Sequence, residues 1–386
     1  MDYSNSWILN KIDEICLFVR DGTHGSFKDD DNGIPLLSAK DISDGKIHVY
    51  EDSRRISISD YNTIHKKYEL EIGDILLTIV GTIGRTAMVD NSIKFTLQRS
   101  VAILRTNNEV SNNFIYYYIQ SPTFQKRLKS MVNQSAQGGV YLNSLKKLKI
   151  SIPNDLDEQN KISYFLMQID KKIELLENKY QKYVDFKKYL MQQIFAQNLR
   201  FDENCQYATK KVKDFLVESK IEGTDDINKR LTVKLNLKGI TIRESKTIEI
   251  EGATKQFIRK SGQFIYGKQN LHKGAFGIVP KELDGYLTSS DIPSFDFKGE
   301  IEPKWFYYYF SRKSFYEKLE SLSTGTGSKR ISPKEFLNIK IIVPEIEEQH
   351  RIVYLLEKFD EKINGISNQI TQMDMFKKSL LQQMFI

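Results

Sequence analysis

Loops between short apolar runs, several of them flanked by glycine, carry side chains that can form paired hydrogen bonds with base edges in DNA. In the first half of the chain these candidates are His24, Lys28, Ser38, Lys40, Arg85, Gln98, Arg99 and Gln137. In the second half they are Lys268, Gln269, Asn270, Lys273, Lys329 and Arg330. Each residue alone is explained by a solvated surface position, but as a set on loops they predict contact with DNA.

Signatures of catalysis are incomplete. Residues 262–268 have the spacing of a phosphate-binding loop, but Gln269 stands where a magnesium-binding Ser or Thr belongs, and residues 264–266 read as a strand. No two of the eight prolines are adjacent, so the Asn/Asp-Pro-Pro-aromatic motif of amino-group methyltransferases is absent. Residues 29–31 are three aspartates that we interpret as a solvated turn. We therefore expect neither a catalytic residue nor a metal site in this chain.

Composition places few limits on function. The 386 residues are 40% hydrophobic and 28% charged, with a net charge of +7, which is compatible with nucleic acid without requiring it. Cys16 and Cys205 lie far apart and predict neither a disulfide framework nor a zinc site. No run of eighteen apolar residues occurs, so we expect no membrane span and a cytoplasmic protein.

The chain repeats itself. Residues 158–195 match residues 348–385 without gaps at an offset of about 190. The aromatic stretches 114–119 and 305–310 also align, whereas only patches agree before them. The sequence therefore consists of two tandem halves, each with a variable block followed by a well-matched block.

The well-matched blocks predict two long helices, because their apolar residues alternate at spacings of four and three. Each seam is interrupted once, by Lys187 and by Lys377. A helix of about 37 residues is about 55 Å long. Packing of the helices into separate globular cores is one interpretation; pairing of the two copies as an antiparallel coiled coil is the one we favour. The residues predicted to form this contact are Ile162, Leu166, Ile169, Ile173, Leu176, Ile352, Leu356, Phe359, Ile363 and Ile366.

The variable blocks predict mixed domains, so the fold class is α+β. Short apolar runs at 75–80, 100–104 and 264–266 read as strands between turn residues. Each aromatic stretch begins a predicted helix of about fifteen residues, and its tyrosines fit a buried face better than base stacking. The predicted division is 1–152 (first variable domain), 153–200 (central helix), 201–343 (second variable domain) and 344–386 (C-terminal helix).

In this order and twice over, these motifs resemble the DNA-specificity subunits of type I restriction-modification systems. The resemblance rests on the repeat, on Asp21-Gly22-Thr23-His24, on Gly81-Thr82-Ile83-Gly84, and on the helix starts after Pro153 and Pro344. The second half lacks the Gly-Thr-His loop and the Gly-Thr-Ile-Gly turn. Its contact residues therefore follow less directly from the resemblance.

The resemblance implies a non-catalytic subunit that binds double-stranded DNA. Each variable block would be a target-recognition domain for one half of an asymmetric, split sequence. The paired helices would set the length of the unread spacer and dock two modification subunits, which are adenine methyltransferases. Together with up to two motor-nuclease restriction subunits, these partners would carry S-adenosylmethionine, ATP and magnesium, while this chain would hold no cofactor.

A different class of function is also compatible with the sequence. The moderate charge and the long heptad pattern fit a coiled-coil scaffold for other proteins, without sequence-specific DNA binding. The two hypotheses differ in the salt dependence of DNA binding, which is steep only for a protein that neutralises phosphates.

Overall fold

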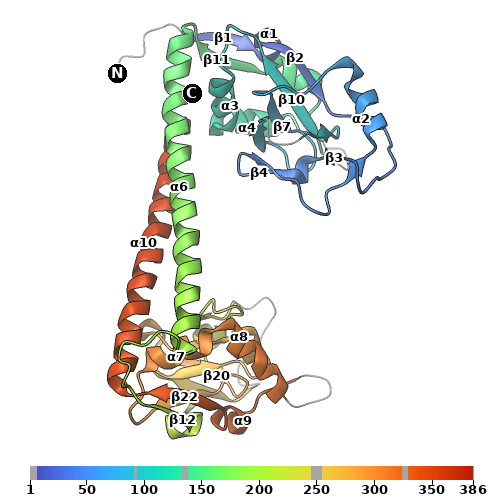
Figure 1. The fold of residues 1–386 in the computed structure, drawn as a ribbon. Coiled ribbons are helices and arrows are strands. Elements are labelled where there is room, and N and C mark those ends of the chain that lie inside the picture. Colours follow the sequence, from blue (N-terminus) through green and yellow to red (C-terminus); the bar gives the residue numbers. More distant parts are fainter. Residues whose placement is uncertain (1–6, 91–93, 133–137, 245–253, 324–328, 386) are drawn as a thin grey trace. The chain divides into compact units, whose positions relative to one another are not determined.

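The computed structural model describes residues 7–90, 94–132, 138–244, 254–323 and 329–385. The chain divides into two compact units, Met1–Asn178 with Ser367–Ile386, and Lys179–Ile366. Each unit combines a mixed α/β domain with parts of the two long helices, α6 (Leu156–Phe195) and α10 (Ile346–Met384) (Figure 1).

The first unit is built on an antiparallel four-stranded sheet of order β2-β10-β7-β8. Its strands are β2 (Cys16–Asp21), β10 (Val101–Thr106), β7 (Ile75–Thr78) and β8 (Thr86–Met88). Two smaller sheets accompany it, β1 (Trp7–Lys11) with β11 (Lys149–Pro153), and β3 (Ile34–Leu37) between β6 (Arg55–Ile56) and β9 (Thr96–Leu97). Further elements are the pair β4 (Ile42–Ser43) and β5 (Lys46–Ile47), the helices α1 (Ile12–Ile15), α2 (Ile58–Ile64), α3 (Asn112–Gln120), α4 (Pro122–Ser130) and α5 (Leu142–Lys147), and the 3-10 turns Ala39–Asp41 and His65–Lys67.

The second unit repeats this frame. Its four-stranded sheet has the equivalent order β13-β21-β18-β19, with β13 (Leu216–Ser219), β21 (Ser294–Phe297), β18 (Phe264–Tyr266) and β19 (Phe276–Ile278). The pair β12 (Tyr207–Lys211) and β22 (Lys340–Pro344) corresponds to β1 and β11. Additional strands are β14 (Glu222–Gly223), β17 (Gln256–Arg259), β20 (Tyr286–Ser289), β15 (Leu231–Val233) and β16 (Ile240–Ile242). Its helices are α7 (Pro303–Ser311), α8 (Lys313–Tyr316) and α9 (Pro333–Leu337). Because β18 uses its amides in strand pairing, the loop-like spacing at 262–268 is not a phosphate cradle.

The aromatic helices are core elements, as their pattern predicts. Phe114, Tyr118 and Ile119 are buried in the first unit, and Phe306 and Phe310 are buried in the second. Burial of such large side chains in the core leaves none of these rings available for stacking on bases.

The predicted length of these helices is wrong. The first stretch forms two short helices where one helix of about fifteen residues was predicted. Helix α3 ends before Ser121, and α4 begins at Pro122. Proline disfavours a helical conformation in the residue before it, and Ser121 is extended. The Ser121 side chain instead caps α4 by accepting a hydrogen bond from the Phe124 N–H at 3.2 Å.

The start of each long helix is fixed by a buried glutamine. The Gln159 side chain accepts a hydrogen bond from the Ser111 N–H and donates one to the Pro153 carbonyl, both at 2.9 Å. Gln349 makes the equivalent bonds to the Glu302 N–H at 2.8 Å and to the Pro344 carbonyl at 2.9 Å. Each glutamine therefore ties a long helix to the strand before it and to the aromatic helix of its own domain.

The long helices run antiparallel. In the first unit, Leu166 near the start of α6 shares a core with Leu381 and Phe385 near the end of α10. In the second unit, Ile194 near the end of α6 shares a core with Ile352 near the start of α10. Within each unit, one helix therefore contributes its first turns and the other its last turns to the same core.

Lys187 and Lys377, which interrupt the apolar seams of the two long helices, make equivalent polar contacts in the two units. In the second unit, Lys187 of α6 lies 2.5 Å from the Asp360 carboxylate of α10, and the Tyr308 hydroxyl donates to the same carboxylate at 2.6 Å. The Lys187 ammonium also lies 4.8 Å from the centre of the Tyr308 ring. Each group thus meets a partner from another element.

In the first unit, Lys377 of α10 lies 2.7 Å from Asp170 of α6, and the Tyr117 hydroxyl donates to Asp170 at 2.8 Å. Burial and the adjacent Asp170 carboxylate raise the pKa of Tyr117, so its hydroxyl remains a donor. We call each set a Tyr–Asp–Lys triad: Tyr117–Asp170–Lys377 and Tyr308–Asp360–Lys187. Each triad joins α6, α10 and the aromatic helix of one domain.

We expect Asp360→Ala to lower the free energy of unfolding by about 1–3 kcal/mol, because the nearly buried Tyr308 hydroxyl and Lys187 ammonium lose their acceptor. Denaturant unfolding of the purified chain measures this change. Asp374→Ala, which removes an exposed acid from the same helix, is the matched control. Equal stability of the two variants would contradict the role given to the triad.

Candidate nucleic-acid interface

Three backbone hydrogen bonds join the loop after β2 to residues 97–101, which comprise the end of β9, the loop after it and the start of β10. The Gly22 N–H donates to Val101, and the Thr23 N–H donates to Leu97 at 2.7 Å. The Arg99 N–H donates back to the Thr23 carbonyl at 3.1 Å. A Cβ at Gly22 would lie only 2.1 Å from the Leu97 oxygen, so this close approach requires glycine.

A third segment joins these two loops. Strand β3 runs parallel to β9, and the Gln98 N–H donates to the Leu37 carbonyl at 2.8 Å. Immediately afterwards, the Ala39 N–H donates to the Ser100 hydroxyl at 3.1 Å. The structure therefore brings together three loops that are separated in the sequence by strands, and each carries residues predicted to contact DNA.

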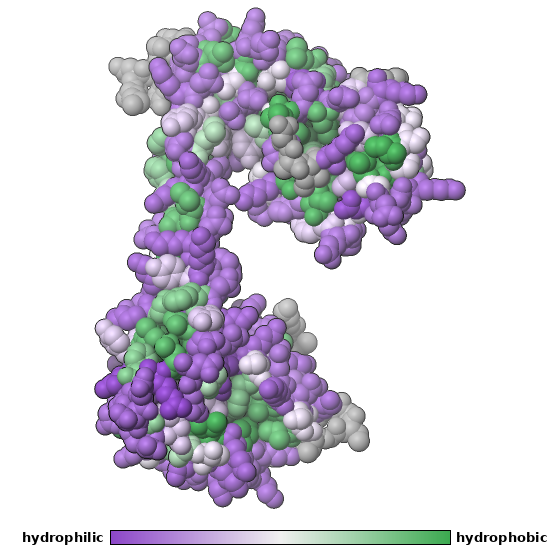
Figure 2. All heavy atoms as spheres, viewed as in Figure 1, coloured by the Kyte–Doolittle hydropathy of each residue, from purple (hydrophilic) through white to green (hydrophobic). Residues whose placement is uncertain are grey.

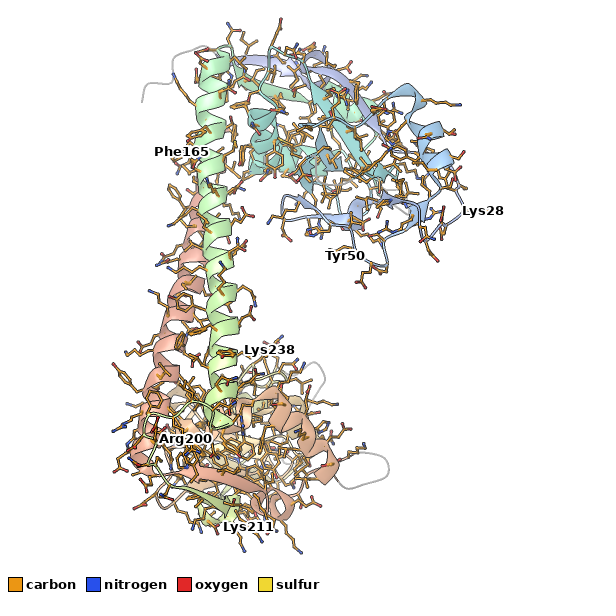
Figure 3. The ribbon with its side chains drawn as sticks, in the orientation of Figure 1. Lys28, Tyr50, Phe165, Arg200, Lys211 and Lys238 are labelled. Atoms are coloured by element: carbon orange, nitrogen blue, oxygen red, sulfur yellow. The ribbon has the colours of Figure 1, made fainter. Side chains whose placement is uncertain are left out.

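On this three-loop surface, His24, Lys28, Lys40 and Arg99 are exposed and Gln98 is half-buried. Figure 3 shows Lys28 projecting from the rim of the first unit. His24 Nε2 lies 2.7 Å from an Asp21 carboxylate oxygen, which orients the ring without burying it. These side chains are able to meet a ligand without any rearrangement of the core.

Ser38, Arg85 and Gln137 differ from this group. The Ser38 hydroxyl donates to the Asp41 carboxylate at 3.0 Å, so it forms part of a local turn. Arg85 is exposed beside this turn and donates to the Ile42 carbonyl at 3.3 Å. Gln137 lies outside the described residues.

The second unit also gathers its predicted residues. Lys268, Gln269 and Asn270 follow β18, and Lys273 ends the short turn after them. The Ile331 N–H donates to the Lys268 carbonyl at 2.9 Å, which places the Lys329-Arg330 segment beside this loop. Two separated parts of the sequence therefore form one surface here.

Both cations of the second segment have acidic partners. Lys329 lies 3.1 Å from Glu320, and Arg330 lies 3.2 Å from Asp291. The Lys329 ammonium lowers the pKa of the exposed Glu320. Exposed ion pairs of this kind contribute little stability and are readily exchanged for phosphate contacts.

The sequence pattern did not single out helix α2, which lies next to the three-loop surface. Ser59, Asn62, Thr63 and Lys66 are all exposed and are spaced to share one helical face. The i, i+3, i+4, i+7 spacing of these polar residues was the available signal, but the segment is short, and its apolar positions mix tyrosine and histidine with isoleucine.

The long helices present a second kind of surface. The residues predicted to form the helix contact are turned inward: Ile162, Leu166, Ile169, Ile173, Leu176, Ile352, Leu356 and Ile366 are buried, and Phe359 and Ile363 are half-buried. Other apolar side chains of the same helices remain exposed, as the hydropathy colouring shows (Figure 2). Phe165 projects from α6 away from the sheets of its unit (Figure 3).

Other kinds of site find no support in the described residues. No group of three His, Cys, Asp or Glu side chains there converges on a possible metal position. In the same part of the chain, no helix is long and apolar enough to cross a membrane.

The chain has two domains built on the same frame, and each presents a surface formed by loops from separate parts of the sequence. The type I restriction modification DNA specificity domain matches the chain twice, at residues 6–182 and 205–372. The chain therefore belongs to this family.

Individual relatives agree with this assignment. The putative type I restriction enzyme MjaX specificity subunit of Methanocaldococcus jannaschii is 24% identical over 411 residues, which cover 97% of this chain and 92% of that protein. The EcoBI specificity subunit of Escherichia coli is 29% identical over 135 residues, which cover 34% of this chain and 27% of that protein.

Solved structures share the fold. The S subunit of a type I restriction-modification system from M. genitalium has a TM-score of 0.60 at 14% identity, covering 100% of this chain and 98% of that one. A chain from a study of assembly and conformational transition of the type I system has a TM-score of 0.59 at 12% identity, covering 99% and 98%.

We predict that Arg99→Ala changes the DNA sequence recognised by the first unit without preventing assembly with partner subunits. Arg99 is exposed on the three-loop surface, and loss of a bidentate arginine contact reduces discrimination at one base pair by about 1–3 kcal/mol. Competition binding with base-substituted duplexes measures the change. Lys126→Ala, an exposed cation on α4, is the control, and an unchanged preference for Arg99→Ala would reject the assignment.

Proposed function

We propose that this chain is the non-catalytic recognition subunit of a type I restriction-modification complex, and that it reads a bipartite, asymmetric DNA target with one domain per half-site. One observation carries the proposal. The two units share a sheet order and a helix anchor, yet the loops they present are different. The first unit presents joined loops around Thr23 and Arg99, and the second presents Lys268–Lys273 with Lys329 and Arg330. Unlike loops on one frame suit two unlike half-sites.

We further propose that the paired helices dock two modification subunits. In the first unit, Tyr164 is 63% exposed and Phe376 is 47% exposed. At the equivalent positions of the second unit, Tyr354 is 66% exposed and Phe186 is 49% exposed. Exposed aromatic side chains are typical anchors of protein interfaces. Because the repeat places the same residue types on both units, it supports two copies of one partner.

Catalysis then belongs to the partners. We propose that two adenine methyltransferase subunits use S-adenosylmethionine, and that up to two restriction subunits use ATP and magnesium. Double-stranded DNA would be held jointly, because partner subunits can supply much of the contact to phosphates. This division is consistent with the modest net charge of +7 on this chain.

The alternative function is a coiled-coil scaffold for other proteins, without sequence-specific DNA binding. The exposed apolar side chains of the long helices also fit this function. Measurements of DNA binding in solution distinguish the two hypotheses. A recognition subunit with its methyltransferase binds its target with a steep salt dependence, whereas a scaffold shows neither the preference nor the slope.

The decisive experiment is to express this chain with its methyltransferase subunit and map methylated adenines across the host genome. We expect a new split motif that disappears when this chain is omitted. The control is the methyltransferase alone, with its binding to this chain verified by co-purification. A co-purifying, active methyltransferase that gives no new motif would favour the scaffold hypothesis.

We also predict that the helices set the spacer of the motif. Removing residues 176–182 and their repeat equivalents 366–372 shortens each helix by one heptad, about 10 Å, or about three base pairs of DNA. We expect the methylated motif to lose about three base pairs of spacer, or methylation to be lost if the partners cannot realign. The same genome map measures this, and an unaltered spacer in an active complex would refute the prediction.

A further inference from the structure

Helix α2 has a surface that its own packing does not explain. None of its seven residues is fully buried, and none belongs to a hydrophobic core cluster. The inward face carries Tyr61 and leads through the short turn His65–Lys67 to Tyr68. The outward face carries Ser59, Asn62 and Thr63, and Lys66 of the following turn continues it; all four side chains are exposed.

A column of rings and cations fixes the inward face. The Tyr61 and His65 rings are stacked with their centres 4.2 Å apart, and the His65 and Tyr68 centres are 4.8 Å apart. The Lys94 ammonium lies 4.5 Å above Tyr61, and the Arg20 guanidinium lies 3.5 Å above Tyr68. Cations over ring faces are stabilising. Tyr68 at the end of the column also packs against an aliphatic core cluster of the first unit, so the column connects the helix to that core.

The same column ties α2 to the three-loop surface. His65 Nε2 lies 2.9 Å from the Thr96 hydroxyl, two residues before Gln98. Burial lowers the pKa of His65, so its ring stays neutral in this contact. At the other end, Arg55, three residues before α2 begins, accepts a backbone hydrogen bond from Asp30 at 3.1 Å. Helix α2 therefore lies between two loops of the first unit that are predicted to meet DNA.

The second unit has no counterpart to this helix in its described residues. Between β13 and β18, residues 220–244 and 254–263 contain short strands and a single turn of 3-10 helix, Ile227–Lys229. Where two domains share a frame, the elements that differ are the ones able to distinguish their targets.

From these observations we infer that α2 is a base-reading helix of the first unit, with Ser59, Asn62, Thr63 and Lys66 facing the major groove of its half-site. This inference rests on the proposed function and adds a reading element to it. An α-helix with its side chains is about 10–12 Å across, which fits a groove about 12 Å wide.

The chemistry of this face favours a particular base. The Asn62 amide presents a donor beside an acceptor, which matches the edge of adenine. Thr63 already donates its hydroxyl to the Ser59 carbonyl at 2.9 Å, so its methyl group remains for contact with thymine. Lys66 supplies a charge for phosphate or guanine. The inferred ligand is therefore a duplex segment containing an A·T pair.

The test is Asn62→Ala in the full chain, expressed with the methyltransferase and scored by the genome map of methylated adenines. We expect one A·T position of one half-site to become degenerate, with about a ten-fold loss of preference there. The other half-site and the spacer should stay unchanged. Asn143→Ala, an exposed asparagine on helix α5 of the same unit, is the matched control.

Each other outcome has a defined meaning. An unchanged motif in both Asn62→Ala and Lys66→Ala overturns the inference. Loss of co-purification with the methyltransferase overturns it as well, because α2 would then be a protein contact. Equal weakening of both half-sites also contradicts it. If the unsubstituted chain gives no motif, the proposed function itself fails, which is a separate result.

Discussion

Each long helix has one lysine in its apolar seam, and each lysine meets an aspartate of the other helix. A charge at such a position is tolerated only where a partner lies at the same level, so the pair favours one register over others. Because Tyr117 and Tyr308 donate to the same aspartates, register and domain position are set together. The loops predicted to contact DNA depend on this arrangement, since they are attached to a frame that the triads hold against the helices.

Within each unit, the contacts that stabilise the frame therefore differ from the side chains proposed to contact DNA. The frame uses repeated contacts, namely the buried glutamines, the triads and the aromatic cores. The loops are stabilised by backbone hydrogen bonds, as between Thr23 and Leu97, which place few demands on side chains apart from Gly22. Side chains such as Arg99 and Lys28, which are exposed, are consequently free to change without cost to the core.

Much of the fold could be predicted from the sequence, because its strongest signals are periodic. The heptad seams predicted both long helices, and the repeat predicted two equivalent domains. The buried face of the 114–119 stretch was also correct. Its length was not, because the break at Ser121 depends on Pro122 and on a side-chain cap, which interrupt a pattern that otherwise continues. Helix α2 escaped notice because it has only seven residues and because stacked rings and cations contribute to its packing.

What the sequence by itself determined is the set of elements, the internal repeat and the family resemblance, all of which are local or periodic properties of the chain. Only the tertiary structure decided which loops adjoin one another. Thr23 meets Arg99, and Lys268 meets Ile331, through backbone hydrogen bonds that carry no side-chain signature. The partners of Lys187 and Lys377 were equally undetermined, because a lone lysine in a seam does not identify the acid that faces it until the helices are paired.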